Sequence, residues 1–413
     1  MTQLLSPRPG DGSGRVDPRA STHLGQLEVH LKKIDHNFKA IHGLLGRHRS
    51  ENGTRLCAVI KKDAYGLGAV PIAHRLIQAG CPMLAVYSTQ EASQLVQQKI
   101  AVPLLLFMPV TTLSQTDPLY RHAVAGKLHL SIHEPGQLEQ LNRIGQAFGI
   151  QLPVHLYLDT GMSRGGLNAQ KYSEALEQLQ RCSHVCVVGV YSHLATADSN
   201  SSFALWQLKQ FKQLTRKHAN KLPTDVMHHI GNSCATMRGP GFHLDMVRCG
   251  LGLFGYGARD LKDQGIEDLP ALEPAVRWVS HIIHVETYPH HTPIGYGGTH
   301  RLGRNSVLGV VPVGYGDGYP LQLSNKAQAR VMLPGHPPID CRVLGKVNMD
   351  QIVLDLTEAA IQHPNSLLGC NVELISDDPE APCALPTLAK LAHSHCHEML
   401  CRIAAHVPRK YVS

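Results

Sequence analysis

Short apolar runs alternate with polar or helix-periodic segments from Leu27 to about residue 250. Apolar residues recur at helical spacing between positions 69 and 77, 134 and 148, and 203 and 218. Parallel strands need crossover connections, which helices usually supply. Eight strand–helix repeats therefore predict an α/β fold, a parallel (β/α)8 barrel of the TIM type, with a doubly wound open sheet as the alternative. The predicted strands are Arg55–Ile60, Met83–Tyr87, Val102–Phe107, Leu128–Ile132, Val154–Leu158, Val185–Tyr191, Val226–Ile230 and Met246–Cys249.

The pattern changes beyond Pro270 to alternating strands separated by turn signals, which predicts a C-terminal, mainly antiparallel β domain. We expect a loose tail over residues 1–23, the barrel over 24–269 and the β domain over 270–413. A strand-like segment at Gln26–Leu31 can pair with either domain. The β domain is predicted to contain strands Val276–Val285, Ser306–Val313, Ala329–Leu333, Cys341–Val347, Ile352–Leu356 and Asn371–Ile375, and one helix, Leu385–Cys401.

Composition narrows the class of protein. Hydrophobic residues make up 43% and charged residues 17%, which excludes a disordered chain. The longest apolar run, Ile100–Val110, has about half of the roughly 20 residues needed to span a membrane, and the N-terminus lacks a signal-peptide segment. The 11 cysteines include no Cys-x-x-Cys pair, and the net charge of +7 is spread along the chain. We expect a cytoplasmic protein with reduced thiols and an anionic small-molecule partner, with no membrane or nucleic-acid binding.

Candidate chemistry lies where the predicted barrel strands end, the face that carries active sites in such barrels. Lys61 follows the first strand, and the neighbouring Lys62 would lower its pKa and favour a Schiff base; the alternative is an ordinary surface lysine. The pattern Gly250–Gly255 matches G-x-G-x-x-G, but without a βαβ unit it does not predict a dinucleotide site. The backbone N–H groups of this glycine pattern, together with the Ser233 hydroxyl, suit a phosphate. Other strand ends carry Asp159–Arg164, Ser192 and His193, Asn232, and Arg248.

One motif surrounds Lys61, the segment Ala58–Gly68 (AVIKKDAYGLG). Further motifs follow in order: Asp159–Arg164, Tyr191–Asp198, His229–Ser233, Met246–Gly250, Ile294–Gly297, Pro312–Gly318, Gly345–Gln351 and Val407–Arg409. This series resembles the alanine racemases, fold-type III pyridoxal-phosphate enzymes that combine a barrel with a C-terminal β domain, and Ala58–Gly68 is similar to the family's lysine motif. The resemblance runs from about Gly25 to the C-terminus.

The resemblance implies a homodimer that racemises alanine with pyridoxal phosphate and supplies D-alanine for cell-wall precursors. Lys61 would hold the cofactor and act as one base, and Tyr296 from the other subunit would act as the second. Arg164 and Met349 would bind the substrate carboxylate. Arg248 would face the pyridine nitrogen. The resemblance also implies an entrance lined by Tyr315 and Asp198, and support of the site by Asp350. Further cofactor contacts are implied for Tyr65, His193, Asn232, Ser233, Gly250, Leu251 and His397.

Two positions depart from the family pattern. Tyr157 stands where many members have a lysine, often carbamylated, that orients the arginine, so Arg164 would be held by an uncharged phenol. His397 stands where a tyrosine usually reaches the phosphate, and its shorter imidazole changes the pocket wall. These departures keep a serine or broad-specificity racemase open as an alternative. Arg248 makes a decarboxylase of the same fold less favourable, because arginine leaves the ring nitrogen unprotonated.

The sequence leaves two further alternatives, a metal site and a non-enzymatic protein. His393 and His397 have the i, i+4 spacing of metal ligands on a helix, but the surrounding alternation spreads the other side chains, and no metal is expected. A cofactor-binding regulatory homologue without turnover is the non-enzymatic alternative. The presence of both implied bases, Lys61 and Tyr296, favours an enzyme.

Overall fold

The computed structural model describes residues 25–46, 53–363 and 367–413, which fall into two compact units. Of the described residues, the barrel unit comprises those within 28–276 together with 395–403 and 409–413, and the β unit comprises those within 277–394 with 404–408 and 25–27. The expected tail, 1–23, lies outside the described residues. Because each unit is assembled from separate stretches of chain, its side chains come from distant parts of the sequence.

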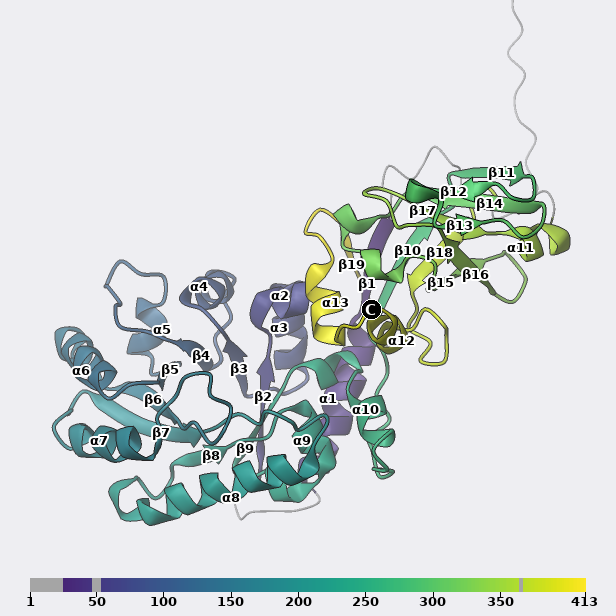
Figure 1. Cartoon of the computed structure of the whole chain (residues 1–413). Coiled ribbons are helices and arrows are strands. Elements are labelled where there is room, and N and C mark those ends of the chain that lie inside the picture. Colours follow the sequence, from purple (N-terminus) through teal and green to yellow (C-terminus); the bar gives the residue numbers. More distant parts are fainter. Residues whose placement is uncertain (1–24, 47–52, 364–366) are drawn as a thin grey trace, which may run out of the picture. The chain divides into compact units, whose positions relative to one another are not determined.

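Eight parallel strands close into a barrel, which confirms the predicted TIM-type fold and excludes the doubly wound open sheet (Figure 1). Neighbouring strands pair in chain order, and the last pairs with the first through Arg55↔Met246. The strands are β2 (Arg55–Val59), β3 (Met83–Val86), β4 (Leu104–Pro109), β5 (Leu128–Ile132), β6 (Leu152–Tyr157), β7 (Val185–Tyr191), β8 (Met227–His229) and β9 (Met246–Cys249).

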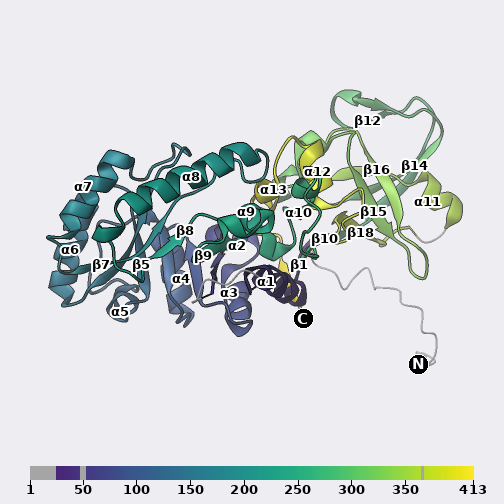
Figure 2. The same cartoon turned by 90° about the horizontal axis from the view of Figure 1, so that it is seen from below.

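Helices surround the barrel, and Figure 2 shows α6, α7 and α8 along its outer side. Several begin at a side-chain cap, such as Asn168, Asn200 and Asn232, whose side chains accept hydrogen bonds from backbone amides of the first turn. The helices of this unit are α1 (Leu31–Gly46), α2 (Lys61–Gly66), α3 (Ala69–Gln78), α4 (Thr89–Gln97), α5 (Tyr120–Val124), α6 (Gly136–Phe148), α7 (Ala169–Leu179), α8 (Ser201–Lys217), α9 (Ser233–Arg238), α10 (Ala258–Lys262) and α13 (Cys396–Arg402).

The barrel is filled by two kinds of side chain. One part is an apolar cluster of Cys57, Val59, Met83, Ala85, Leu105 and Met246 from β2, β3, β4 and β9. The other part is polar and comes from β5, β6, β8 and β9, where His129, His155, His229 and Arg248 bond to one another. Buried polar groups are stable only when they are hydrogen-bonded, so this second part is a built feature of the fold.

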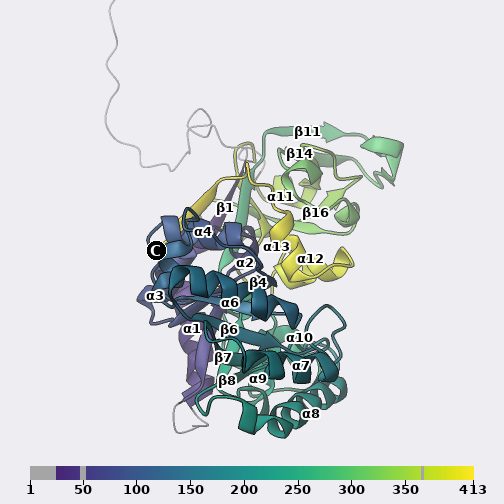
Figure 3. The ribbon, with the colours of Figure 1, turned by 90° about the vertical axis from the view of Figure 1, so that its left-hand side faces the viewer.

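The β unit contains an antiparallel sheet, as predicted. Its strands lie in the order β11-β14-β17-β16-β15-β18-β10, with β11 at one edge (Figure 3), and β1 (Gly25–His30) and then β19 (Arg409–Val412) follow β10 in the strand order. The strands are β10 (Val276–His281), β11 (His284–Tyr288), β14 (Ser306–Val311), β15 (Gln328–Met332), β16 (Ile339–Leu344), β17 (Ile352–Asp355) and β18 (Asn371–Ile375), and a separate pair is formed by β12 (Pro293–Ile294) and β13 (His300–Arg301).

Two predicted elements of the C-terminal region were wrong in extent. The run Val276–Val285 is two strands, because β10 pairs with β18 whereas β11 pairs with β14. The single helix Leu385–Cys401 is also two helices, α12 (Leu385–Leu391) and α13, because the chain turns at His393, where φ is +52°. The remaining helix is α11 (Thr357–Gln362). Among the described residues, no helix is long and apolar enough to cross a membrane.

Candidate active site

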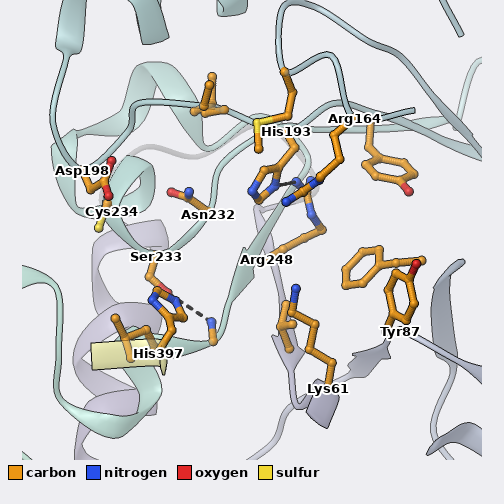
Figure 4. A pocket seen from close by; sticks show the side chains of 18 of the residues that line it. Lys61, Tyr87, Arg164, His193, Asp198, Asn232, Ser233, Cys234, Arg248 and His397 are labelled. Atoms are coloured by element: carbon orange, nitrogen blue, oxygen red, sulfur yellow. Dashed lines mark hydrogen bonds between the residues drawn. The ribbon is translucent and has the colours of Figure 1, made fainter. Parts of the chain in front are cut away.

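A cavity of about 550 Å³ opens at the carboxyl ends of the barrel strands (Figure 4). This volume lies in the range of small-molecule and cofactor sites. All of its lining residues belong to the barrel unit. It brings together most of the residues predicted from the sequence: Lys61, Tyr65, Tyr157, Arg164, His193, Asp198, Asn232, Ser233, Arg248, Gly250, Leu251 and His397.

Lys61 points into the cavity from the end of β2 (Figure 4). The four residues after it, 62–65, all have φ between +52° and +60°, so α2 is largely a left-handed turn. Left-handed backbone is costly for residues other than glycine, and such strain concentrates at functional sites. Desolvation, followed by the charge of Arg164, lowers the pKa of the Lys61 amine. A neutral amine is the form that attacks a carbonyl carbon, so this lysine is suited to Schiff-base chemistry.

Arg248 is buried at the end of β9 and makes several hydrogen bonds. Its Nη2 donates to the carbonyl oxygen of Ser192 at 2.7 Å, and its Nη1 donates to Nδ1 of His229 at 2.9 Å. Nη2 also lies 3.4 Å from Nδ1 of His193. Desolvation and then the charge of Arg248 lower the pKa of His193 to about 3, so this imidazole is neutral at physiological pH. The guanidinium is therefore the fixed positive charge at this point of the cavity.

Ser233 and the loop after β9 form a cradle of polar groups. The Ser233 Oγ accepts hydrogen bonds from the amides of Gly250 and Gly252, both at 3.1 Å. A β-carbon at Gly250 would lie 2.1 Å from the Tyr65 hydroxyl oxygen, so only glycine leaves room for that hydroxyl here. Backbone amides and hydroxyls gathered at a helix start, here that of α9, are typical of phosphate sites.

His397 lies beside this cradle (Figure 4), with its ring 5.5 Å from that of Tyr65. Partial desolvation and the charge of Lys61 lower its pKa. A neutral imidazole still donates one hydrogen bond.

Arg164 reaches the cavity from the loop after β6. The Asp159 carboxylate accepts hydrogen bonds from the amides of Gly161, Met162 and Ser163, which shapes this loop into a tight turn. The Arg164 side chain hydrogen-bonds the hydroxyl of Tyr157, whose pKa is raised chiefly by desolvation. The phenol is therefore uncharged at neutral pH, and it holds the guanidinium through an uncharged oxygen.

Several lining residues were not found by sequence reasoning. Three of them lie at or near the ends of β3, β4 and β5, where the sequence analysis predicts no chemistry. Met162, in the loop after β6, and Tyr191 lie within predicted motifs without an assigned role, and the Tyr191 ring stacks on Tyr157 with centroids 4.7 Å apart. Applying the strand-end rule to all eight strands would have found the first three. The residues are Tyr87, Phe107, His133, Met162 and Tyr191.

The other predicted residues, Tyr296, Tyr315, Met349 and Asp350, belong to the β unit. Three of them have unusually exposed large side chains, with exposed fractions of 71% for Tyr296, 55% for Met349 and 46% for Tyr315. Tyr315 donates its amide proton to Asn348, and a β-carbon at Gly314 would lie 2.2 Å from the Met349 carbonyl oxygen, so these two segments adjoin.

The segment before Tyr296 packs on the one before Asn348. A β-carbon at Gly345 would lie 2.9 Å from the carbonyl oxygen of Ile294. The backbone of the β unit therefore links the segments carrying Tyr296, Met349 and Tyr315 into one continuous surface.

The histidine-rich segment at 393–397 does not have the helical spacing assumed for it. His393 precedes α13 with a positive φ, so His393 and His397 do not share a helix. Among the residues that the structure describes, no group of three or more His, Cys, Asp or Glu side chains is placed to hold a metal ion.

Comparison with known proteins identifies the family. The family model described as alanine racemase, N-terminal domain, matches residues 29–258, and the model of the C-terminal domain matches 275–411. The alanine racemase of Halothermothrix orenii is 32% identical over 387 residues, covering 93% of this chain and 96% of that protein. The alanine racemase of Symbiobacterium thermophilum is 33% identical over 390 residues, with coverages of 93% and 96%.

The solved structures that this chain resembles are also alanine racemases. The alanine racemase from D-cycloserine-producing Streptomyces lavendulae is 25% identical, with a TM-score of 0.81 and coverage of 95% of this chain and 98% of that one. The alanine racemase of Clostridium difficile 630 is 27% identical, with a TM-score of 0.78 and coverages of 95% and 96%. The fold is shared with the Bartonella henselae alanine racemase, solved with covalently bound pyridoxal phosphate, at 24% identity, a TM-score of 0.76 and coverages of 94% and 99%. The chain belongs to the alanine racemase family.

Proposed function

We propose that this protein is a pyridoxal-phosphate-dependent alanine racemase. The observation that carries the proposal is the cavity at the barrel's carboxyl face, where the Lys61 amine, the Arg248 guanidinium and the Ser233 cradle converge. Relatives over nearly the whole chain are named alanine racemases, and the Bartonella henselae structure holds the cofactor covalently. These features support the assignment of the same cofactor and substrate to this chain.

The residues present fit the cofactor. Lys61 has the lowered pKa that an attachment lysine needs, and a phosphate would meet the Ser233 and Tyr65 hydroxyls and the backbone at Gly250 and Leu251, where Ser233 Oγ already holds the Gly250 amide. Asn232, His193 and His397 line the same wall. Bound there, pyridoxal phosphate would draw electrons from an attached amino acid and acidify its α-proton.

Arg248 would face the pyridine nitrogen. Because a guanidinium has only N–H donors and does not give up its proton, it keeps that nitrogen unprotonated. A less electron-withdrawing ring favours returning the proton to the α-carbon over decarboxylation or transamination. This supports racemisation as the reaction.

The two proton-moving groups would be Lys61 and Tyr296 of the partner subunit. The Lys61 amine would hold the proton on one face of the α-carbon, and the Tyr296 phenol would exchange it on the other. Arg164 and the backbone of Met349 of the partner subunit would bind the substrate carboxylate. Tyr315 and Asp198 would border the entrance, and Asp350 would support the site from behind. The high exposure of Tyr296 and Met349 supports a homodimer, since both side chains are free to reach a second copy.

We place the activity in the cytoplasm, supplying D-alanine for cell-wall precursors. None of the 11 cysteines forms a disulfide bond, as is usual in a reducing compartment.

Incubating the full-length protein and pyridoxal phosphate with a mixture of L-amino acids, followed by chiral analysis, tests the proposal. We expect D-alanine from the wild-type protein and from the control variant Lys62→Ala. In the wild-type protein the Lys62 amine lies over the Tyr87 ring, 5.5 Å from its centroid. Lys61→Ala should form no D-amino acid and should lose the absorbance of covalently held cofactor. D-Alanine from Lys61→Ala, or an unchanged spectrum, would contradict the assignment.

The departures at Tyr157 and His397 favour a second candidate, a serine or broad-specificity racemase, because both alter the cavity wall. D-Serine or several D-amino acids in the same assay would support it. Cofactor binding without any D-product would support a regulatory homologue.

A further inference from the structure

Three histidines, of which His155 and His229 are fully buried and His129 partly buried, form a continuous hydrogen-bonded ladder across the barrel interior that ends on Arg248. Nδ1 of His129 lies 2.9 Å from Nε2 of His155, and Nδ1 of His155 lies 2.9 Å from Nε2 of His229. Nδ1 of His229 lies 2.9 Å from Nη1 of Arg248. The four residues come from β5, β6, β8 and β9, so the ladder crosses half of the barrel.

The ladder passes over β7 at Gly189. In the register of the sheet, His155 lies opposite Gly189, and a β-carbon there would stand only 2.1 Å from Nδ1 of His155. Any other residue at this position would collide with the ring that makes the bond to His229. The missing side chain on β7 is therefore a structural requirement of the ladder.

The Arg248 end of the ladder has a fixed hydrogen-bonding role. A guanidinium can only donate, so Arg248 donates to Nδ1 of His229. The other end, at His129, is partly exposed, and desolvation lowers the pKa of this imidazole to about 4.

This end condition determines the proton positions along the neutral rings. Since Nδ1 of His229 accepts from Arg248, its proton is on Nε2, which donates to Nδ1 of His155. His155 then carries its proton on Nε2 and donates to Nδ1 of His129, which leaves the His129 proton on Nε2. Each neutral imidazole gives one bond and takes one, whereas a second proton on any ring would oppose two N–H groups. Desolvation lowers the pKa of His155 and of His229, which agrees with neutral rings.

The groups that face the ladder leave this order undisturbed. Tyr191 stacks on the His229 ring with centroids 5.0 Å apart, and its hydroxyl donates to Ser131 at 2.9 Å. The Ser131 hydroxyl in turn donates to the Leu106 carbonyl at 2.6 Å. Each of these donors is therefore satisfied outside the ladder.

We propose that His129, His155 and Gly189 are positioning residues, which lock His229 in one tautomer and thereby hold the Arg248 guanidinium in a single orientation. The ladder fixes the acceptor that faces Arg248, as partners of a histidine fix its tautomer in other active sites. Its functional consequence rests on the proposed function, in which Arg248 faces the cofactor ring. Its tautomer order can be tested without any activity.

The first experiment measures imidazole ¹⁵N shifts in the full-length, histidine-labelled protein with pyridoxal phosphate added. We expect His129, His155 and His229 all to be neutral with the proton on Nε2, their signals being assigned from their changes in His155→Gln. A proton on Nδ1 of His155 or His229, or an imidazolium at either, would overturn the ladder whether or not the protein racemises alanine.

The second experiment compares matched variants. His155→Leu removes both bonds, whereas the amide of His155→Gln can accept from His229 and donate to His129. We expect kcat of His155→Leu to fall by about tenfold or more with KM within about twofold, and the absorbance maximum of bound cofactor to shift; His155→Gln should recover most of both. Equal effects of the two variants, or a normal kcat and spectrum in His155→Leu, would overturn the positioning role.

A third variant tests the crossing point without changing any imidazole. Gly189→Ala should reproduce the losses of His155→Leu, whereas Gly43→Ala in α1, where an added β-carbon meets no atom within 4 Å, should behave as wild type. If neither His155→Leu nor Gly189→Ala folds, the His155→Gln kinetics and the ¹⁵N shifts still decide. A wild-type protein without cofactor binding or turnover would contradict the proposed function alone.

Discussion

At the scale of single residues, Tyr157 decides how Arg164 is held. Burial keeps the phenol neutral, and the Arg164 side chain donates to its oxygen. The Tyr157 ring is fixed independently, since it stacks on Tyr191 at an interplanar angle of 14°. Removing only the hydroxyl therefore changes the arginine's anchor while leaving the wall of the cavity in place.

We predict that Tyr157→Phe raises KM for alanine by about tenfold, because losing a hydrogen bond to a charged group costs about 1.5 kcal/mol. Steady-state kinetics in both reaction directions measure the change. Tyr172→Phe is the matched control, since that buried hydroxyl has no hydrogen-bond partner among the described residues, and its KM should equal that of wild type. An unchanged KM in Tyr157→Phe would mean that Arg164 is oriented by something else.

At the scale of elements, the left-handed turn of α2 sets the direction in which the chain leaves Lys61. The turn ends at Gly68, where φ is +96° and an added β-carbon would lie 1.8 Å from the Tyr411 hydroxyl. That hydroxyl donates to the Leu67 carbonyl at 3.1 Å, so β19 and α2 are joined at this point. A residue other than glycine would strain the backbone and break the junction at once.

Gly68→Ala should therefore lower Tm by roughly 2–12 °C, since the backbone alone costs about 1–3 kcal/mol and 1 kcal/mol shifts Tm by about 2–4 °C in a domain of this size. Scanning calorimetry of the cofactor-loaded protein measures it. Gly43→Ala, inside a helix with open space around the added atom, should be neutral or slightly stabilising. Equal melting temperatures for the two variants would show that the turn accommodates a side chain.

The predictable elements are those with a repeating pattern. The eight barrel strands are short apolar runs, and β2 and β6 are buried along almost their whole length, which is why the sequence predicts them. The turn at residues 62–65 has no such pattern, and Gly66, which follows it, lies against Leu400 of α13 and Arg409 of β19 from the far end of the chain. The break at His393 could not be predicted from the pattern, because the apolar spacing continues across it.

The residues of the histidine ladder stand out in the sequence pattern, but the ladder itself could not be predicted from it. His129 and His155 each interrupt an apolar strand at an alternate position, and Gly189 does the same on β7. Each interruption alone is unremarkable in sequence. Only the closed order of strands brings them to neighbouring positions in one barrel, so their relation could not be derived before the register was known.

At the scale of the whole molecule, the candidate residues divide between two bodies. Lys61, Arg164 and Arg248 line the barrel cavity, whereas Tyr296, Tyr315 and Met349 are exposed on the β unit. A two-fold symmetric dimer places the same surface of each copy against the other, so it would form two equivalent sites. In the proposed arrangement, Lys61 and Tyr296 of one site come from different chains. Mixed dimers of two inactive variants can then contain an intact site, which is impossible if each chain carries its own site.

Lys61→Ala and Tyr296→Phe should each abolish racemisation, yet hybrids of the two should regain it. In a hybrid dimer one site lacks both groups, while the other combines the intact Lys61 of one chain with the intact Tyr296 of its partner. Random pairing of equal amounts makes half of the dimers hybrids, and half of the hybrid sites are intact, so about one quarter of wild-type activity is expected. Co-expression with two affinity tags isolates the hybrids, in which activity should reach about one half.

A second pairing provides the control. Hybrids of wild-type and double-variant chains, carrying both Lys61→Ala and Tyr296→Phe on one polypeptide, contain no intact shared site, because each site then receives one defective group. Their activity should be near zero if the site is shared and about one half if each chain carries its own complete site. A shared site and a single-chain site therefore predict opposite activities for the two hybrids. An activity of one half for the second hybrid would show that Tyr296 serves the barrel of its own chain.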